Sequence, residues 1–358
     1  MKPLRTGITT GLCAAAAAKA ATMMLLSDER PEHVEVTAKN GAKIKLDVTD
    51  TIQEQGLIKC AVKKDAGDDP DITNGIKIFA AVSKTDAEGI EIEGGEGVGR
   101  VTKPGLKVPV GKAAINPVPM EMIKSAIEET CALFSYHGGI KVIISIPGGT
   151  EIAKKTMNQR LGIVGGLSIL GTTGIVEPMS NKAIIETIKT EIDVLSAQGN
   201  KKLLITPGNY GRDFAENVLG LNMEGALKCS NFIGETLDYL LLKDIEEITL
   251  IGHAGKLVKI AGGIMNTHSN IADCRMEIIS AHCALMGAQA ATIKQIMECV
   301  TVEAAIKIMK ELSISDSVWE SIGQKIGFHL GERTKGKLVV EFIVFTQEHG
   351  VLFKGLTV

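Results

Sequence analysis

The second half of the chain alternates short, continuously apolar segments with longer segments of helical periodicity. Apolar runs occupy residues 140–146, 167–170, 202–206 and 248–251. Runs of this length fit strands that are buried on both faces of a parallel sheet. The helical patterns between them occupy residues 181–196, 213–219 and 234–242. This alternation predicts a doubly wound, mostly parallel α/β domain over residues 137–336, with helical segments at 275–330.

The first third of the chain has a different pattern, in which apolar and polar residues alternate. An alanine-rich helix is expected at 12–26 and a second helix, introduced by Pro117 and Pro119, at 120–134. Asn40-Gly41 stands between alternating segments at 34–38 and 43–48, which is a strong hairpin signal. Two further strands are expected at 57–63 and 76–82, and a glycine-rich stretch follows at 89–105. We therefore expect a mixed α+β domain over residues 1–136, and the C-terminal hairpin within 337–358 is a candidate to join its sheet.

Composition narrows the class of protein. The 358 residues carry a formal net charge of −3, and aromatic residues make up only 3 % of the chain, which argues against nucleic-acid binding. No uninterrupted apolar stretch reaches about 18 residues, so no membrane partner is expected. The seven scattered cysteines include no C-x-x-C pair, which argues against a disulfide framework or a zinc site and favours a cytoplasmic protein without a bound metal. A signal peptide is the alternative for the apolar N-terminal segment, although Lys19 interrupts it.

Several expected strands end in turns rich in small polar residues. In an open parallel sheet, ligands bind beyond the carboxyl ends of the strands, where backbone groups are exposed. Gly171, Thr172, Thr173 and Gly174 follow one run, and Thr206, Gly208 and Asn209 follow another. Turns at 147–150 and 252–256 complete the set, which predicts a binding crevice at this edge of the sheet.

The N-terminal turn is a second candidate site. Thr9, Thr10 and Gly11 precede the alanine run, and the N–H groups at a helix start favour a carboxylate or phosphate. An ordinary helix cap, with Thr9 or Thr10 as the capping residue, is the alternative.

Cations and histidines near these turns supply the candidate chemistry. Arginine binds carboxylates through both oxygens, and five cations stand beside glycine-rich turns: Arg5, Arg100, Arg160, Arg212 and Lys256. His253 and His268 flank one polar loop and are candidates for proton transfer. Asn74 lies in another polar turn, at 71–75. No G-x-x-x-x-G-K-[ST] phosphate loop occurs.

Motifs spread over nearly the whole chain resemble the CbiD family, the cobalt-precorrin-5B C1-methyltransferases of anaerobic cobalamin biosynthesis. The resemblance begins at Arg5-Thr6-Gly7-Ile8-Thr9-Thr10-Gly11-Leu12-Cys13, where Ile8 replaces the usual aromatic residue and Leu12 the usual hydroxyl residue. It continues at 69–75, 145–149, 158–162, 165–176, 206–209, 231–234 and 252–269.

The resemblance implies S-adenosylmethionine as the methyl donor and a tetrapyrrole as the substrate. On this interpretation, Gly171–Gly174, Thr206, Gly208 and Asn209 bind the donor, and His253 or His268 is the base. The substrate carboxylates would bind at Arg5, Thr9, Thr10, Asn74 and Arg100. The cobalt belongs to the substrate. A non-catalytic tetrapyrrole carrier and an ATP-dependent phosphotransferase stay open as alternatives, as does a homo-oligomeric state.

Overall fold

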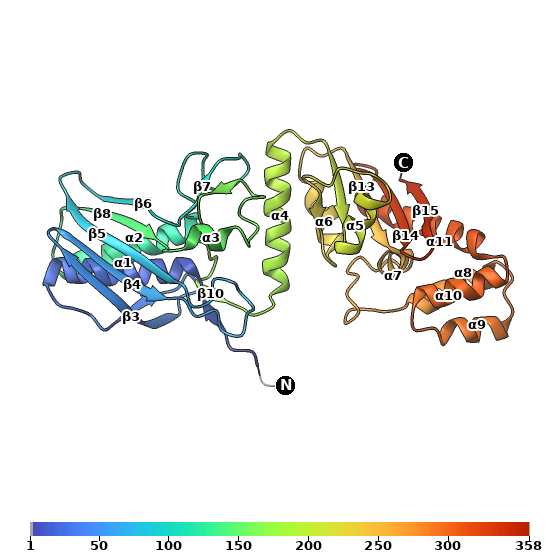
Figure 1. Cartoon of the computed structure of the whole chain (residues 1–358), viewed down its shortest axis with the longest axis horizontal. Helices are drawn as coiled ribbons and strands as arrows, with labels where there is room; N and C mark the ends of the chain where they lie inside the picture. The colour runs from blue at the N-terminus through green and yellow to red at the C-terminus, as the bar shows by residue number, and fades with distance from the viewer. Residues whose placement is uncertain (1–2, 358) are drawn as a thin grey trace. The chain divides into compact units, whose positions relative to one another are not determined.

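The computed structural model describes residues 3–357, and the chain divides into two compact units, Met1–Ala183 and Ile184–Val358 (Figure 1). The first unit is built on a six-stranded sheet in the order β2-β3-β4-β5-β8-β6. Neighbouring strands are antiparallel except for β8 and β6, which are parallel. The strands are β2 (His33–Thr37), β3 (Lys43–Glu54), β4 (Leu57–Lys63), β5 (Lys77–Thr85), β6 (Ile90–Gly94) and β8 (Gly139–Ser145).

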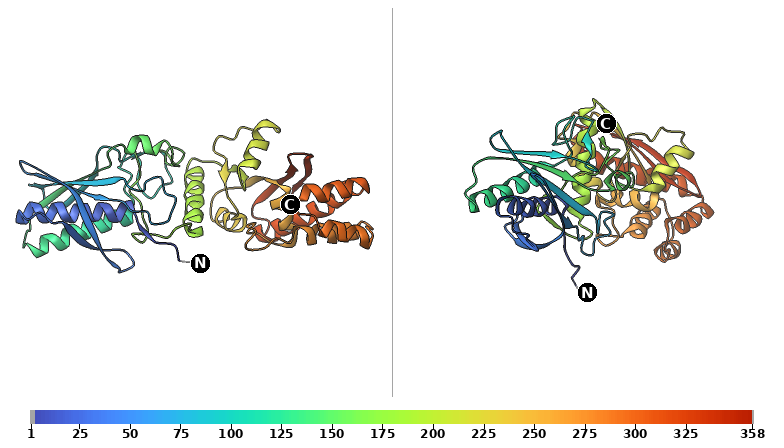
Figure 2. Two further views of the ribbon diagram at one scale, coloured as in Figure 1. Left: turned by 60° about the horizontal axis from the view of Figure 1, so that its bottom comes forward. Right: turned by 60° about the vertical axis from the view of Figure 1, so that its left-hand side comes forward.

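Helices α1 (Thr10–Ser27) and α2 (Pro117–Leu133) lie side by side against this sheet (Figure 2). The alanines of α1 are at most 1 % exposed. Because these side chains are so small, the two helices approach closely: a Cβ atom added at Gly11 would lie 2.7 Å from Cγ of Pro119. By length and composition alone, α1 is apolar enough to cross a membrane, but its buried side chains form the core of this unit.

Short elements complete the first unit around the start of α1. Strand β1 (Gly7–Ile8) pairs with β10 (Ile175–Val176), and β7 (Arg100–Val101) pairs with β9 (Ile163–Val164). A short helix, α3 (Gly149–Ala153), follows β8. The β1–β10 pair brings the loop at 170–174 next to the first turn of α1.

The second unit is built on a five-stranded sheet in the order β12-β11-β13-β14-β15. The first four strands are parallel, and β15 is antiparallel to β14. The strands are β11 (Lys202–Thr206), β12 (Leu227–Lys228), β13 (Glu247–His253), β14 (Val339–Thr346) and β15 (Gly350–Leu356).

Helices cover both faces of the second sheet. One face packs Phe214 of α5 (Asn209–Asn217) against Ile251 and Phe345. The opposite face packs Leu250 and Phe342 against six other helices. These are α4 (Asn181–Ala197), α6 (Ile233–Leu240), α8 (Arg275–Leu285), α9 (Ala290–Met297), α10 (Val302–Glu311) and α11 (Ser315–Thr334). The short α7 (Ala254–Leu257) and a 3-10 turn (Val258–Gly262) follow β13.

The mixed α/β class agrees with the sequence analysis, but three expectations about the domains need correction. The units divide after residue 183 and not near 136, because the apolar run at 140–146 is β8, a strand of the first sheet. The run at 167–170 makes only isolated bridges, through Leu167 and Ile169. The hairpin within 337–358 is β14–β15, and it joins the second sheet through the pairing of β14 with β13. In each case the apolar pattern favours extended, buried backbone but does not specify its pairing partner.

Candidate functional site

The order of the strands creates a topological switch point in the second unit. The chain leaves β11 towards β12 at one edge of the sheet, and it leaves the neighbouring strand β13 towards β14 on the other side. Ligands of open α/β sheets bind beyond the carboxyl ends of two such strands, where the connections diverge. We therefore place the candidate site at the loops that follow β11 and β13.

Lys256 links these two loops. Its Nζ atom donates to the carbonyl oxygen of Pro207 at 2.9 Å and to Oδ1 of Asn231 at 2.8 Å. The side of the loop near Gly208 is open, because a Cβ atom added there would meet nothing closer than Nζ of Lys256, at 3.8 Å. Helix α5 begins directly afterwards and has no side-chain cap. The two loops therefore form a polar surface with room beside Gly208.

Both ring nitrogens of His253 are engaged. Nδ1 accepts a hydrogen bond from the backbone N–H of Gly255 at 3.2 Å, and Nε2 lies 3.0 Å from Oε1 of Glu303. Burial lowers the pKa of His253, although Glu303 offsets part of this effect. Because Nδ1 accepts this bond, its lone pair is occupied and the ring proton lies on Nε2, facing Glu303. In this geometry His253 orients the loop and has no free lone pair to act as a base.

The loop at 263–274 lies along the same edge. Lys259 is 3 % exposed, and its Nζ atom donates to the carbonyl oxygens of Thr267 at 3.2 Å and Ala272 at 2.8 Å. His268 is exposed, and its Nδ1 accepts from the N–H of Asn270 at 3.1 Å. Lys259 thus holds the loop to the 3-10 turn that follows β13, and His268 lies at the surface.

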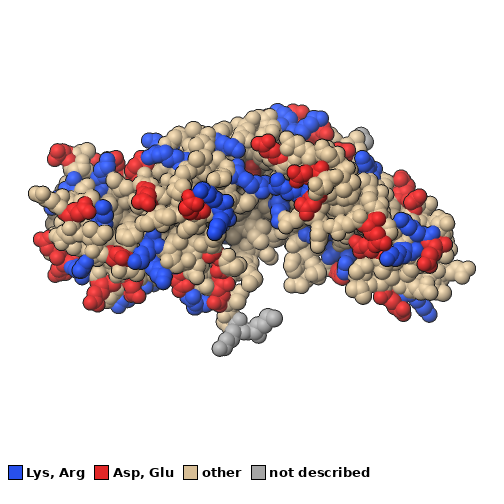
Figure 3. All heavy atoms as spheres, viewed as in Figure 1, with Lys and Arg blue, Asp and Glu red and all other residues tan. Residues whose placement is uncertain are grey.

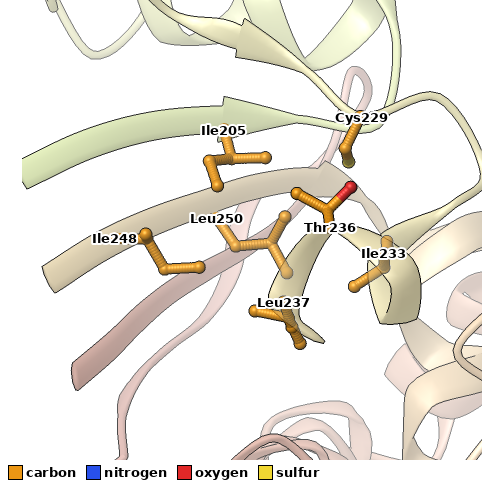
Figure 4. Close-up of a pocket in the computed structure, with 7 residues that line it drawn as sticks. All are labelled: Ile205, Cys229, Ile233, Thr236, Leu237, Ile248 and Leu250. Carbon is orange, nitrogen blue, oxygen red and sulfur yellow. The ribbon is translucent and has the colours of Figure 1, made fainter. Parts of the chain in front are cut away.

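An apolar cluster lies beneath the loops that follow β11 and β13. Figure 4 shows side chains of β11, β13 and α6 that meet there with Cys229. The space between them admits no water molecule, and burial raises the pKa of the Cys229 thiol to about 12. These side chains pack the two strands against α6 and leave no room for a ligand.

The other donor-binding candidates lie in the first unit, beside the start of α1. The N–H groups of Thr9 and Gly11 donate to the carbonyl oxygens of Gly174 and Leu170, each at 3.0 Å. Gly171 has φ +143°, and a Cβ atom added there would lie 2.4 Å from Oγ1 of Thr9. The sequence-predicted set Gly171, Thr172, Thr173 and Gly174 is therefore separate from Thr206, Gly208 and Asn209, and it packs against α1.

Thr9 and Thr10 are both buried, and the hydroxyl group of each forms hydrogen bonds. Thr9 caps α1 by accepting from the N–H of Leu12 at 3.2 Å. The Thr10 hydroxyl donates to the carbonyl oxygen of Leu170 at 3.1 Å and accepts from its N–H at 2.9 Å. These bonds complete the cap without a ligand, so the structure favours the helix-cap alternative over an open anion site.

The remaining substrate candidates lie on the surface of the first unit. Arg5 forms a two-fold contact with Asp65, which holds the pKa of that carboxyl at about 2. Oδ1 of Asn74 accepts from the N–H of Ala66 at 2.9 Å. Arg100 is half exposed and reaches Glu93 at 3.4 Å. Lys and Arg side chains lie among Asp and Glu side chains over the face in Figure 3.

Sequence reasoning missed Asn231, Lys259 and Glu303 as parts of the site. Asn231 stands in a family-like motif at 231–234, so a signal was present. Glu303 comes from α10, 50 residues beyond His253, and no local pattern connects the two. Over residues 3–357, no cluster of three or more His, Cys, Asp or Glu side chains is arranged to hold a metal ion.

A mostly parallel sheet with helices on both faces defines an α/β unit, and units of this class bind ligands at the loops of their switch point. Residues 1–178 match the family model CbiD, and residues 266–355 match the model described as CbiD, C-terminal domain. The chain is 54 % identical over 345 residues to a cobalt-precorrin-5B C(1)-methyltransferase of Ruminiclostridium cellulolyticum, covering 96 % of this chain and 90 % of that protein. The chain belongs to the CbiD family.

A second relative agrees with this membership. A protein of Methanocaldococcus jannaschii with the same name is 45 % identical, with 94 % of this chain and 92 % of that protein covered. The solved structure of a cobalamin biosynthesis protein (cbiD) of Archaeoglobus fulgidus is 31 % identical, with a TM-score of 0.41 and coverage of 75 % of this chain and 83 % of that one.

Proposed function

We propose that this chain transfers the methyl group of S-adenosylmethionine to C1 of cobalt-precorrin-5B, giving cobalt-precorrin-6A in anaerobic cobalamin biosynthesis. The observation that carries this proposal is the 54 % identity, over nearly the full length of both chains, to a relative named for that reaction. The cobalt is part of the substrate.

The donor binds at the switch point of the second unit in this proposal. Gly208 leaves the backbone open there, and Asn209 is fixed by Lys228, whose Nζ atom donates to its Oδ1 at 2.8 Å. Thr206 is buried, and its carbonyl oxygen accepts from the N–H of Cys229 at 3.0 Å. Thr206 therefore shapes the loop, while Gly208 and Asn209 face the donor.

Methyl transfer requires little acid–base catalysis at the donor, because the leaving group is neutral. The substrate carbon attacks the methyl carbon, the carbon–sulfur bond breaks, and its electron pair remains on the neutral thioether of S-adenosylhomocysteine. The protein contributes by holding the two reacting atoms in line at near-attack distance and by excluding water.

A proton leaves the macrocycle, and the loop at 263–274 supplies the group that takes it. His268 is exposed, and its Nδ1 lone pair becomes free to accept a proton once the hydrogen bond from the N–H of Asn270 is released. His253 uses both nitrogens. We therefore assign the base to His268 and a positioning role to His253.

Macrocycle carboxylates are bound by exposed cations of the first unit in this proposal. Ion pairs between exposed side chains contribute only about 0–1 kcal/mol, so a substrate carboxylate exchanges easily with the protein carboxylate. The side chains of Arg100 and Glu93 are 52 % and 38 % exposed, and their atoms lie 3.4 Å apart. This pair is looser than the two-fold contact of Arg5 with Asp65, so Arg100 is released more easily than Arg5.

The test is to incubate the protein with cobalt-precorrin-5B and S-adenosylmethionine carrying a ¹³C-labelled methyl group. One labelled methyl at C1 is expected, with stoichiometric S-adenosylhomocysteine. A carrier would bind the macrocycle without binding the donor. A phosphotransferase would consume ATP and form no labelled product.

A further inference from the structure

Lys256 is a partly buried cation that no carboxylate neutralises. Its two hydrogen-bond acceptors, the carbonyl oxygen of Pro207 and Oδ1 of Asn231, are both neutral. Among residues 3–357, no Asp or Glu forms an ion pair with Lys256. Burying an ammonium group without a counter-charge costs free energy. A lysine at position 256 therefore calls for a role that offsets this cost.

The neighbouring charges increase this cost. Burial is the main cause that lowers the pKa of Lys256, and Lys228 and Lys259 lower it further. Cys229 would raise it only as a thiolate, but the Cys229 thiol is protonated at neutral pH because burial raises its pKa to about 12. The local potential is therefore positive, which favours an anionic ligand.

Other buried lysines of this chain have their counter-charge. The Lys64 ammonium lies 2.7 Å from Oδ2 of Asp71, and the Lys259 ammonium lies 4.0 Å from Oδ1 of Asp273. Lys256 differs from both, and it is also the lysine that lies at the switch point beside the open backbone of Gly208. An ammonium has three N–H donors, and the protein occupies two of them.

We propose that Lys256 binds the carboxylate of the methionyl part of S-adenosylmethionine and so fixes the donor at the switch point. This inference rests on the proposed function, since it presupposes this donor. The third N–H of Lys256 pairs with the carboxylate, while Pro207 and Asn231 hold the ammonium in place. Lys256 is then a donor-binding residue and not one of the cations for the macrocycle.

The competing role for Lys256 is a structural link between the loops at 207 and 231. The two roles differ in their dependence on the donor carboxylate. S-adenosylmethionine that lacks this group, its decarboxylated form, keeps the sulfonium and the adenosine. If Lys256 is only a structural link, its loss should weaken binding of both forms equally. If Lys256 pairs with the carboxylate, its loss should weaken binding of the complete donor alone.

The experiment measures by calorimetry the affinities of the wild type and of Lys256→Met for both forms of the donor. The wild type is expected to bind S-adenosylmethionine about ten- to hundredfold more tightly than the decarboxylated form, as for a charged hydrogen bond. Lys256→Met is expected to lose this preference while binding the decarboxylated form as the wild type does. Lys256→Arg keeps the charge and is expected to restore part of the preference. Lys243→Met, which removes a partly buried lysine paired with Asp193, is the matched control and keeps the full preference.

The outcomes separate the two proposals. If the wild type binds no S-adenosylmethionine, the proposed function fails and this inference fails with it. If the wild type binds it but Lys256→Met weakens both forms equally, Lys256 is only a structural link. If Lys256→Met weakens macrocycle binding alone, Lys256 serves the substrate carboxylates instead. Melting temperatures identify any unfolded variant, and the preference of Lys256→Arg then decides the test.

Discussion

Gly208 and Gly171 were both predicted to face the donor, but an added side chain meets different surroundings at each. At Gly208 the backbone is extended, with φ 176°, and the space is open. Gly208→Val should therefore fold normally and place its methyl groups where the donor binds. An overpacking cost of about 1–3 kcal/mol corresponds to a tenfold to hundredfold loss of donor affinity. Titration calorimetry with S-adenosylhomocysteine measures this loss.

Gly171→Val is the comparison variant. Its φ of +143° disfavours any side chain, and Thr9 Oγ1 would lie 2.4 Å from the new Cβ. A large fall in melting temperature is therefore expected for this variant. Unchanged donor affinity in Gly208→Val would move the donor away from the switch point.

Thr10 tests the role of the N-terminal turn. Thr10→Val removes the hydroxyl that bonds both the N–H and the carbonyl oxygen of Leu170. The free energy of unfolding should fall by about 1–3 kcal/mol, since two backbone groups lose their partner, while macrocycle affinity stays unchanged. Denaturant unfolding and macrocycle titration on the same variant measure both effects. A tenfold loss of macrocycle affinity at unchanged stability would instead restore the anion-site interpretation.

The polar loop at 64–76 is held by one buried ion pair. The Lys64 side chain is 2 % exposed and pairs with Asp71 at 2.7 Å. Burial raises the pKa of Asp71, but hydrogen bonds from Lys64 and Thr73 outweigh it, so the pKa lies below its usual value. Asp71→Asn leaves the Lys64 charge unpaired, and a loss of about 3–5 kcal/mol of stability is expected.

The pH dependence of this loss has a definite sign. A carboxyl whose pKa is lowered by folding stabilises the protein above its unfolded pKa, and the contribution disappears as pH falls through the folded pKa. The difference between wild type and Asp71→Asn should therefore be full at pH 7 and shrink below about pH 4. Urea unfolding at both pH values tests this, and an equal difference at both would contradict it.

At the scale of elements, the sequence predicts what local patterns determine. The helix near 12–26, the hairpin at Asn40-Gly41 and the C-terminal hairpin are all present. Strand partners were not predictable: a continuous apolar run such as 140–146 fits any central strand, and only tertiary packing places it beside β5. The domain boundary was misplaced for the same reason.

The candidate site shows the same limit. Gly208 and Asn209 were predicted because they follow β11, and His253 was predicted because it lies at the end of β13. Gly171–Gly174 resembled them in sequence, but the run before them forms no strand of that sheet. Glu303 gave no signal, because its contact with His253 depends on how α10 packs against the sheet.

At the scale of the whole molecule, the proposed donor site predicts that donor binding is confined to one unit. A ligand that binds only the folded state stabilises it by mass action, by about 2.7 kcal/mol at a hundred times its Kd. S-adenosylhomocysteine should therefore raise the melting temperature, whereas ATP with Mg²⁺ should have a much smaller effect, because the chain has no phosphate loop.

Hydrogen exchange locates this stabilisation. Lys256 follows β13 and bonds to Pro207 in the loop after β11. If it also binds the donor, as proposed, exchange should slow at residues 206–211 and 252–259. The start of α1 and the loop at 170–174 should exchange as before, since their N–H groups are already paired within the first unit. Lys256→Arg, which keeps the charge, should show the same pattern at reduced strength. Protection confined to 170–174 would instead assign the donor to the first unit, and the turn Gly171–Gly174 would then be the donor site.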